Sequence, residues 1–195
     1  MSIVRRLNHI RRYSSYPVNR QQNVSEHTFW VMLYGYRISE KLKSMGEKVN
    51  VKELLEKGLF HDFEESVTGD IVRTMKYDNP QITKEIKKAE EKLIKRVLDD
   101  LFGNCDTLSI WHNAKDKSLE GQIVAVSDFL CVFEYCLEEI KSGNDFMLDV
   151  LNSAILNFTD FAVTIKNKNL RKLCISYAKL IKKHNIELAE KVFRC

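Results

Sequence analysis

The first residues that could carry chemistry lie in one short stretch of the sequence, GLFHDFEESVTGD at positions 58–70. His61 and Asp62 are adjacent there, and Glu64, Glu65 and Asp70 follow. Imidazole nitrogens and carboxylate oxygens together suit a divalent transition-metal ion, and a metal ion beside spare carboxylates suits hydrolysis of a phosphate ester. A solvated helix end would also gather acids, so the stretch defines a site only if ligands from elsewhere in the chain join it.

Asp128 is a candidate ligand from a second segment. It lies within the most apolar predicted helix, residues 119–141, and its neighbours Val124 and Cys131 one turn away are apolar too. An unpaired carboxylate in such surroundings is unfavourable, so it is normally protonated or matched by a partner. Taken alone, Asp128 is better explained by a partner arginine or a capping bond than by a metal, because structural ion pairs are the commoner cause.

His27 supplies a third segment, at the start of a predicted helix and one turn ahead of its apolar row. A single histidine in that place is more often a hydrogen-bonded core residue than a ligand. Together, however, His27, His61, Asp62 and Asp128 come from three helices, each beside an apolar row that points inward. This set favours one divalent transition ion, among Co, Mn, Fe, Ni and Zn, and the ion would also explain the buried Asp128.

Glu65 is the candidate for moving a proton. It follows His61 by four residues and Asp62 by three, so it lies on the same helix face if the helix continues. A carboxylate there can take a proton from the attacking water or give one to a leaving group. Glu64 points about a hundred degrees away, and we expect it to be solvated. Asp70 follows a Thr-Gly turn, so it is either aimed back at the site or is the cap of the next turn.

Helical periodicity dominates the elements that must position these residues, and we find no alternating strand of useful length. Caps at Asn23, Asn50 and Asn79 predict three helix starts, the last with a proline at its first position. The predicted helices span 24–45, 51–60, 80–103, 119–141, 146–165 and 170–184, with a short amphipathic tail from 186. We therefore predict an all-α fold, one domain of six or seven helices over residues 1–195.

The apolar rows of these helices predict which faces turn inward. The expected rows are Trp30, Val31, Tyr34 and Ile38 in the first helix, Val51, Leu54, Leu55, Gly58 and Leu59 in the second, and Ile82, Ile86, Ala89, Leu93 and Val97 in the third. In 119–141 the row is Ile123, Val126, Leu130, Phe133, Leu137 and Ile140. The C-terminal helices, 145–193, provide either core or dimer surface, and core is the default.

Composition and charge exclude several classes of protein. The chain is 44% hydrophobic and 30% charged, with only seven glycines and two prolines, which suits long helices and short loops. A net charge of +4 would attract an anionic small molecule but is too weak for nucleic acid. No run of eighteen apolar residues spans a membrane. Five cysteines without a CxxC pair are typical of a reducing compartment, so we expect a cytoplasmic protein.

The N-terminal segment allows two interpretations. It holds no acid before Glu26 and contains five arginines and several serines, which is also typical of an organelle transit peptide. Its second half, however, runs directly into the helix start that carries His27. We therefore favour a folded segment that belongs to the site.

Three segments together resemble the HD-domain phosphohydrolases and, more closely, the YfbR-like 5'-deoxynucleotidases. They are NVSEHTFWV, HDFEESVTGDI and VSDFLCVFEYCLEEIKSGN, and the similarity runs from about Arg12 to Asn144. The order H…HD…D, the glutamate three residues after the HD pair, the Thr-Gly-Asp turn and the late helical aspartate all match. A lone HD dipeptide would carry no such information.

The resemblance implies a role for each matching residue. The metal ligands would be His27, His61, Asp62 and Asp128, with Glu65 as the catalytic acid or base. Arg12 would bind the phosphate, for which its guanidinium fork is well suited, and Asp70 would contact the sugar and complete the catalytic set. The resemblance also implies an all-helical bundle, a homodimer and a nucleoside 5'-monophosphate as substrate.

This chain departs from the family pattern around the sugar. Tyr13 stands where the bacterial enzyme has a tryptophan against the sugar, and Ser14 replaces the neighbouring proline. The turn GDIVRTMKY lacks the prolines of its bacterial equivalent, and His112-Asn113 replaces a Trp-x-Glu type segment. Tyr13 is thus the candidate wall of the sugar pocket, and the choice of sugar and of phosphate chain is open.

We expect a metal-dependent phosphomonoesterase that removes the 5'-phosphate of a deoxynucleoside monophosphate. One alternative is a triphosphohydrolase of the same fold, and another is a non-catalytic protein that only binds nucleotides. The intact Glu65 and Asp70 argue against the latter, because a protein that only binds has no need of a proton-transferring group.

Overall fold

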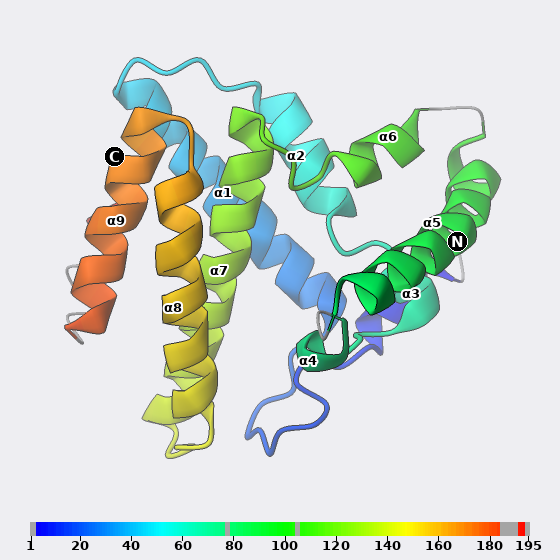
Figure 1. Cartoon of the computed structure of the whole chain (residues 1–195), viewed down its shortest axis with the longest axis horizontal. Coiled ribbons are helices and arrows are strands. Elements are labelled where there is room, and N and C mark those ends of the chain that lie inside the picture. Colours follow the sequence, from blue (N-terminus) through cyan, green and yellow to red (C-terminus); the bar gives the residue numbers. More distant parts are fainter. Residues whose placement is uncertain (1–2, 77–78, 104–105, 184–190, 194–195) are drawn as a thin grey trace.

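Every regular element is a helix in the part of the chain that the computed structural model describes, residues 3–76, 79–103, 106–183 and 191–193 (Figure 1). The long helices are α1 (Val24–Ser44), α2 (Val51–Phe60), α5 (Pro80–Phe102), α7 (Leu119–Lys141), α8 (Met147–Thr164) and α9 (Lys168–Lys182). The short ones are η1 (Val4–Asn8), α3 (Glu65–Thr68), α4 (Arg73–Lys76) and α6 (Thr107–His112). The predicted all-α class and the six long helices are confirmed, whereas the tail predicted from residue 186 lies outside the described part except for residues 191–193.

The predicted caps form as expected. The side chains of Asn23, Asn50 and Asn79 accept hydrogen bonds from backbone N–H groups three residues on, at 2.9, 3.3 and 2.9 Å. These bonds satisfy N–H groups that the first turn of a helix leaves unpaired. At the other end of α5, Gly103 has φ +65°, a conformation that favours glycine and stops the helix.

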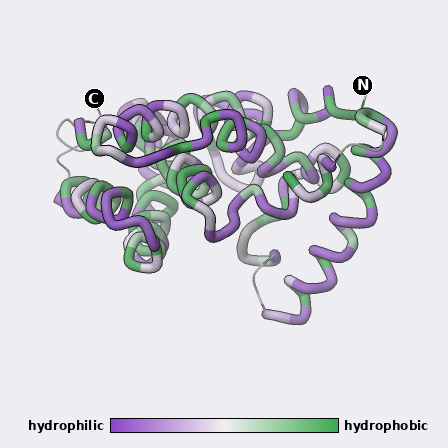
Figure 2. Tube along the Cα trace, turned by 90° about the horizontal axis from the view of Figure 1, so that it is seen from above, coloured by the Kyte–Doolittle hydropathy of each residue, from purple (hydrophilic) through white to green (hydrophobic). Residues whose placement is uncertain are grey.

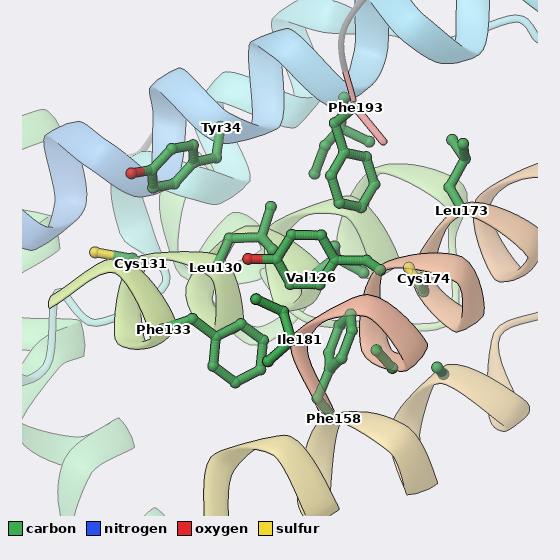
Figure 3. Packing of buried hydrophobic residues seen from close by; sticks show 14 of the residues in the cluster. Tyr34, Val126, Leu130, Cys131, Phe133, Phe158, Leu173, Cys174, Ile181 and Phe193 are labelled. Carbon is green, nitrogen blue, oxygen red and sulfur yellow. The ribbon is translucent and has the colours of Figure 1, made fainter. Parts of the chain in front are cut away.

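The larger of two hydrophobic clusters joins α7, α8 and α9 to most of α1 and part of α2; we call it the large cluster (Figure 3). Phe133 on α7 meets Phe158 on α8 edge to face, with ring centroids 5.4 Å apart, and both rings are fully buried. Tyr177 of α9 stacks on Phe133 at 5.9 Å. Helices α8 and α9 are therefore part of the core, and α7 runs through its middle with apolar side chains on most of its circumference.

A separate, small cluster lies on the other side of the molecule, formed by η1, the first turn of α1, the end of α2, and α5 (Figure 1). Its buried members are Leu7, Val24, Phe60, Phe63, Ile94, Val97 and Leu98. The face predicted for α5 is buried only toward its C-terminal end, where Val97 is 6% exposed, whereas Ile82 and Leu93 are 36% and 39% exposed. The N-terminal half of α5 extends away from the other helices (Figure 2), so only its C-terminal half finds apolar partners.

Trp30 was also predicted to face inward, and this is wrong. Its side chain is 37% exposed and stacks on Tyr34, at a centroid distance of 6.0 Å. Trp30 lies at the edge of the buried stripe of α1, and Phe29, Leu33 and Tyr36 beside it are between 45% and 55% exposed. In α2, likewise, Leu59 is 45% exposed. A continuous apolar surface thus runs along the outside of α1.

The N-terminal segment folds back onto α1 and α7. Arg11 and Asn23 form an isolated antiparallel bridge, and the backbone N–H of Arg12 donates to Gln22 at 2.9 Å. Further along, the carboxylate of Glu139 on α7 accepts from the backbone N–H groups of Asn19 and Arg20, at 2.7 and 2.8 Å. These bonds bring Arg12 next to the helix start that carries His27 and favour the reading of this segment as part of the site.

No helix within the described residues has the length and apolarity needed to cross a membrane.

Candidate metal and phosphate site

The four predicted ligands converge at one point between the two clusters. The Nε2 atoms of His27 and His61 lie 3.2 Å apart. An oxygen of Asp62 lies 3.2 Å from His61 Nε2 and 3.4 Å from His27 Nε2, and an oxygen of Asp128 lies 3.2 Å from His27 Nε2. Donor atoms of His27, His61 and Asp128 all fall within 4.8 Å of one another, close enough to hold one metal ion.

Hydrogen bonds orient both imidazoles toward this point. The Nδ1 of His61 donates to the carbonyl oxygen of Gly58 at 2.7 Å, which turns Nε2 toward the other ligands. The Nδ1 of His27 lies 3.1 Å from the sulfur of Cys131. Burial raises the pKa of Cys131 to about 12, so this group is a thiol. Its sulfur can accept a hydrogen bond from Nδ1, and in that tautomer His27 also presents the lone pair of Nε2. Partners of this kind fix the tautomer and ring orientation of metal-binding histidines.

Both aspartates are ionised. Burial alone would raise the pKa of Asp62, but the nearby His61 and Lys115 outweigh it and hold the pKa well below its usual range. For Asp128 burial again opposes ionisation, and Lys115 and His27 outweigh it. Two imidazole nitrogens and two carboxylates fit a borderline divalent ion such as Co, Mn, Fe, Ni or Zn. The donor set therefore suits the metal that the sequence predicts.

Glu65 lies beside this donor set. The helix does not continue as assumed, because α2 ends at Phe60, but His61 and Glu64 keep helical backbone angles and the spacing argument still holds. Burial and the charge of Asp62 raise the pKa of Glu65 to about 9, so it carries a proton at neutral pH. Its Oε2 is buried without a protein partner, whereas buried polar atoms normally have one. The group is thus available to a bound molecule.

Glu64 contradicts the expectation of a solvated side chain. It is only 6% exposed and accepts a hydrogen bond from the indole N–H of Trp111 at 2.8 Å, with Lys76 at 3.6 Å. Trp111 of α6 covers Glu64, and the periodicity of a single helix cannot predict that another helix lies there. Glu64 therefore belongs to a buried polar network next to the site.

Arg12, Tyr13 and Asp70 are the predicted substrate-binding residues. The guanidinium of Arg12 lies 3.4 Å from Asp62, and its Nε is buried without a protein partner. Tyr13 has φ +56°, unusual for a residue with a side chain, and its ring stacks on Tyr135 at 4.8 Å. Asp70 follows the end of α3, and its charge helps to raise the pKa of Glu65. Arg12 thus contacts the donor set directly, Asp70 is close enough to Glu65 to affect its charge, and Tyr13 lies next to Arg12.

Lys115 is a site residue that the sequence did not reveal. Its Nζ donates to an oxygen of Asp128 at 2.7 Å and lies 3.5 Å from Asp62. It sits in the loop between α6 and α7, where neither helical periodicity nor a motif marks it. Only its position shortly before the helix of Asp128 could have drawn attention to it.

The fold defines the class of protein. An HD-domain phosphohydrolase from Listeria innocua superposes with a TM-score of 0.74 at 22% identity, covering 96% of this chain and 86% of the other. A conserved hypothetical protein from Pyrococcus furiosus gives a TM-score of 0.72 at 20% identity, covering 91% and 96%. The all-helical architecture is thus that of the HD-domain proteins.

The sequence defines the family within that class. A family model described as 5'-deoxynucleotidase YfbR-like matches residues 1–166, and the chain belongs to this family. Proteins named 5'-deoxynucleotidase from Klebsiella pneumoniae and from Escherichia coli are each 34% identical over 131 residues. One from Vibrio vulnificus is 33% identical over 128 residues. The chain spans 65% of the length of each of these relatives, and 63% to 65% of it is matched.

Proposed function

We propose that this protein is a metal-dependent 5'-nucleotidase that hydrolyses deoxynucleoside 5'-monophosphates to nucleoside and phosphate. The observation that carries the proposal is the convergence of two histidines and two aspartates beside the buried carboxyl of Glu65 and the guanidinium of Arg12. Membership of the 5'-deoxynucleotidase family and the names of the relatives support the same substrate class.

The divalent ion belongs between His27, His61, Asp62 and Asp128. Bound there, it supplies polarisation of the attacking water and neutralisation of phosphate charge. Nitrogen and carboxylate ligands suit Co, Mn, Fe, Ni and Zn alike, so we leave the choice to direct measurement. Alanine variants of all four residues should lose bound metal and activity together, and full metal occupancy in any two of them, by elemental analysis, would contradict the assignment.

Arg12, Glu65 and Asp70 each have a separate role toward the substrate. Arg12 holds two phosphate oxygens with its fork of N–H donors. Glu65 gives its proton to the 5'-oxygen as the bond from phosphorus to that oxygen breaks and the water oxygen bonds to phosphorus. The proton released by the water restores Glu65. Asp70 accepts a hydrogen bond from a sugar hydroxyl and so fixes the ester in place.

Product analysis separates this proposal from its rivals. The purified protein, with Co or Mn added, should release inorganic phosphate from dAMP and leave dATP largely intact. Release of triphosphate from dATP would make it a triphosphohydrolase. Tight nucleotide binding without turnover of either compound would make it a binding protein only.

Tyr13 is proposed to form the wall of the sugar pocket. A phenol is smaller than an indole, and its hydroxyl can accept a bond from a ribose 2'-hydroxyl. The preference for deoxynucleotides should therefore be modest, and it should strengthen in Tyr13→Trp. The measurement is kcat/KM for dAMP and AMP in both proteins. Equal values for the two nucleotides in the native protein, unchanged in the variant, would mean that Tyr13 does not contact the sugar.

We further propose a homodimer formed through the outside of α1. Phe29, Trp30, Leu33 and Tyr36 leave a row of large apolar side chains exposed there, and exposed rows of this kind often mark interfaces. Light scattering of native protein and of Leu33→Lys should give a dimer and a monomer. Leu156→Lys on α8, where the side chain is 61% exposed, is the matched control and should stay dimeric.

Two broader proposals follow from the same structure. We take residues 1–195 as one HD domain, because α8 and α9 share the large cluster with α1 and α7. We place the protein in the cytoplasm, because Cys131, Cys136 and Cys174 are buried free thiols, as is usual in reducing compartments.

A further inference from the structure

The two oxygens of each aspartate in the donor set face different partners. Oδ2 of Asp62 and Oδ1 of Asp128 point at the histidine nitrogens, at distances between 3.2 and 3.4 Å. The other two oxygens point at Lys115, whose Nζ lies 2.7 Å from Oδ2 of Asp128 and 3.5 Å from Oδ1 of Asp62. Each carboxylate therefore has an inner oxygen, toward the histidines, and an outer oxygen, toward one shared ammonium.

The loop that carries Lys115 is held in place by a buried anchor on α2. Lys57 is 4% exposed, and its Nζ donates to Asp116 at 3.0 Å and to Ser118 at 2.7 Å. Asp116 also accepts from the backbone N–H of Ser118 at 2.9 Å, and Ser118 caps α7. Burial raises the pKa of Asp116, but the bonds from Ser118 and Lys57 outweigh it, so the anchor is a carboxylate. Lys57 precedes His61 by one turn of α2, which ties the loop to a ligand helix.

Gly121 shows that the loop lies very close to α7. A Cβ at this position would stand 2.7 Å from the backbone nitrogen of Asp116 and 2.8 Å from its carbonyl oxygen, closer than real Cβ atoms come. The first turn of α7 therefore has room for the loop only because residue 121 has no side chain. Lys115 is thus placed by packing and hydrogen bonds around it, even though its own side chain is 35% exposed.

We propose that Lys115 is a positioning residue that bridges the outer oxygens of Asp62 and Asp128, so that each aspartate offers only its inner oxygen to the metal. The inference rests on the metal site of the proposed function. Two imidazole nitrogens and one oxygen from each aspartate occupy four coordination positions, whereas both oxygens from each would occupy six. By holding the outer oxygens, Lys115 keeps positions open for water and phosphate, as a catalytic site requires.

Visible absorption of the Co-substituted protein tests this directly and needs no turnover. Six-coordinate Co²⁺ absorbs visible light much more weakly than four- or five-coordinate Co²⁺, and the native site, with four protein atoms and no more than one water on the ion, should be of the strongly absorbing kind. Lys115→Met keeps the length of the side chain but removes its charge, so the freed carboxylates should chelate the ion and the absorption should fall several-fold. Lys115→Arg, which can still donate to both outer oxygens, should keep most of it. Lys117→Met, two residues along with an exposed side chain, is the control and should match the native spectrum.

Asp116→Asn provides a second variant, should Lys115→Met fold poorly. It weakens the anchor at Lys57 without touching the donor set, and it should lower the absorption in the same direction by a smaller factor. A native spectrum in Lys115→Met, or in Asp116→Asn where the methionine variant is not folded, would overturn the inference while leaving the proposed function intact. If the native protein binds no Co²⁺ at all, the metal site of the proposed function is overturned as well.

Discussion

Buried acids behave in opposite ways on the two sides of the donor set. Glu139, beside the large cluster, is 2% exposed, yet hydrogen bonds from Asn144 and from the backbone of Asn19 and Arg20 outweigh burial and lower its pKa. Glu64 and Glu65, beside the small cluster, are equally well buried, but burial and the charge of Asp62 raise their pKa values.

The apolar packing also differs between the large and the small cluster. Around the large cluster, α7, α8 and α9 meet through interlocked aromatic rings, and the cluster extends to α1, so that it fixes the backbone that carries His27 and Asp128. Around the small cluster, short helices and polar networks lie beside the donor set. The large cluster thus provides stability, whereas Glu65 on the side of the small cluster keeps a buried oxygen without a protein partner, which the proposed substrate would supply. Variants in each of the two clusters can test this difference.

The largest expected effect comes from Glu65→Gln. The amide keeps the shape of the side chain but cannot deliver a proton, so kcat should fall by roughly two to four orders of magnitude. Bound metal, measured by elemental analysis, and the free energy of unfolding should change little. A variant that loses its metal together with its activity would show that Glu65 belongs to the donor set instead.

Phe158→Ala should lower the stability of the protein and leave its activity nearly unchanged. Its ring is fully buried between Phe129, Phe133 and Tyr177, and removing such a ring destabilises a core by about 3 to 5 kcal/mol. Urea unfolding should show this loss, while kcat in the folded protein stays near the native value. Leu156→Ala, exposed on the same helix, should stay within about 0.5 kcal/mol of native.

Trp111→Phe probes the polar network of the small cluster. It removes the N–H that Glu64 accepts at 2.8 Å and leaves a buried carboxyl without that partner, which should lower the unfolding free energy by about 1 to 3 kcal/mol. Trp30→Phe on the exposed side of α1 is the matched control, with both changes made in Leu33→Lys so that the proposed dimer surface does not contribute. Equal and small losses in both would mean that the network contributes nothing measurable.

The smallest expected effect is a dependence of the unfolding free energy on pH, which comes from Glu139. Because folding lowers its pKa, this group stabilises the protein above its ordinary pKa of 4.5, and the stabilisation is lost as the pH falls below that value. The difference in unfolding free energy between native protein and Glu139→Gln should therefore be largest at neutral pH and shrink in acid. Glu138→Gln, whose side chain is 64% exposed, should differ little from native at any pH.

Features that depend on one helix were predictable from the sequence, and features that depend on packing between helices were not. The caps at Asn23, Asn50 and Asn79, and both ends of α7, follow from local hydrogen bonding, so their sequence signals were sufficient. The apolar face of α5 was read correctly as apolar, but periodicity cannot say whether another element covers it.

In the candidate site, too, the contacts between distant parts of the chain could not be predicted. His27, His61, Asp62 and Asp128 could be proposed because ligand types and apolar rows mark them in the sequence. Lys115 could not, because its place depends on Lys57, which reaches its loop from a helix far earlier in the chain. Glu64 was placed in solvent for the same reason, since α6 covers it from a distant part of the sequence.

The bridge between Arg11 and Asn23 has a thermodynamic consequence. Asn23 both pairs with the segment that carries Arg12 and caps the helix that carries His27, so one residue restrains the proposed phosphate-binding residue and a proposed metal ligand at once. When binding of one ligand orders Asn23, the conformational entropy of this residue is lost once and is not lost again when the other ligand binds. By linkage, the factor by which metal tightens phosphate binding must equal the factor by which phosphate tightens metal binding.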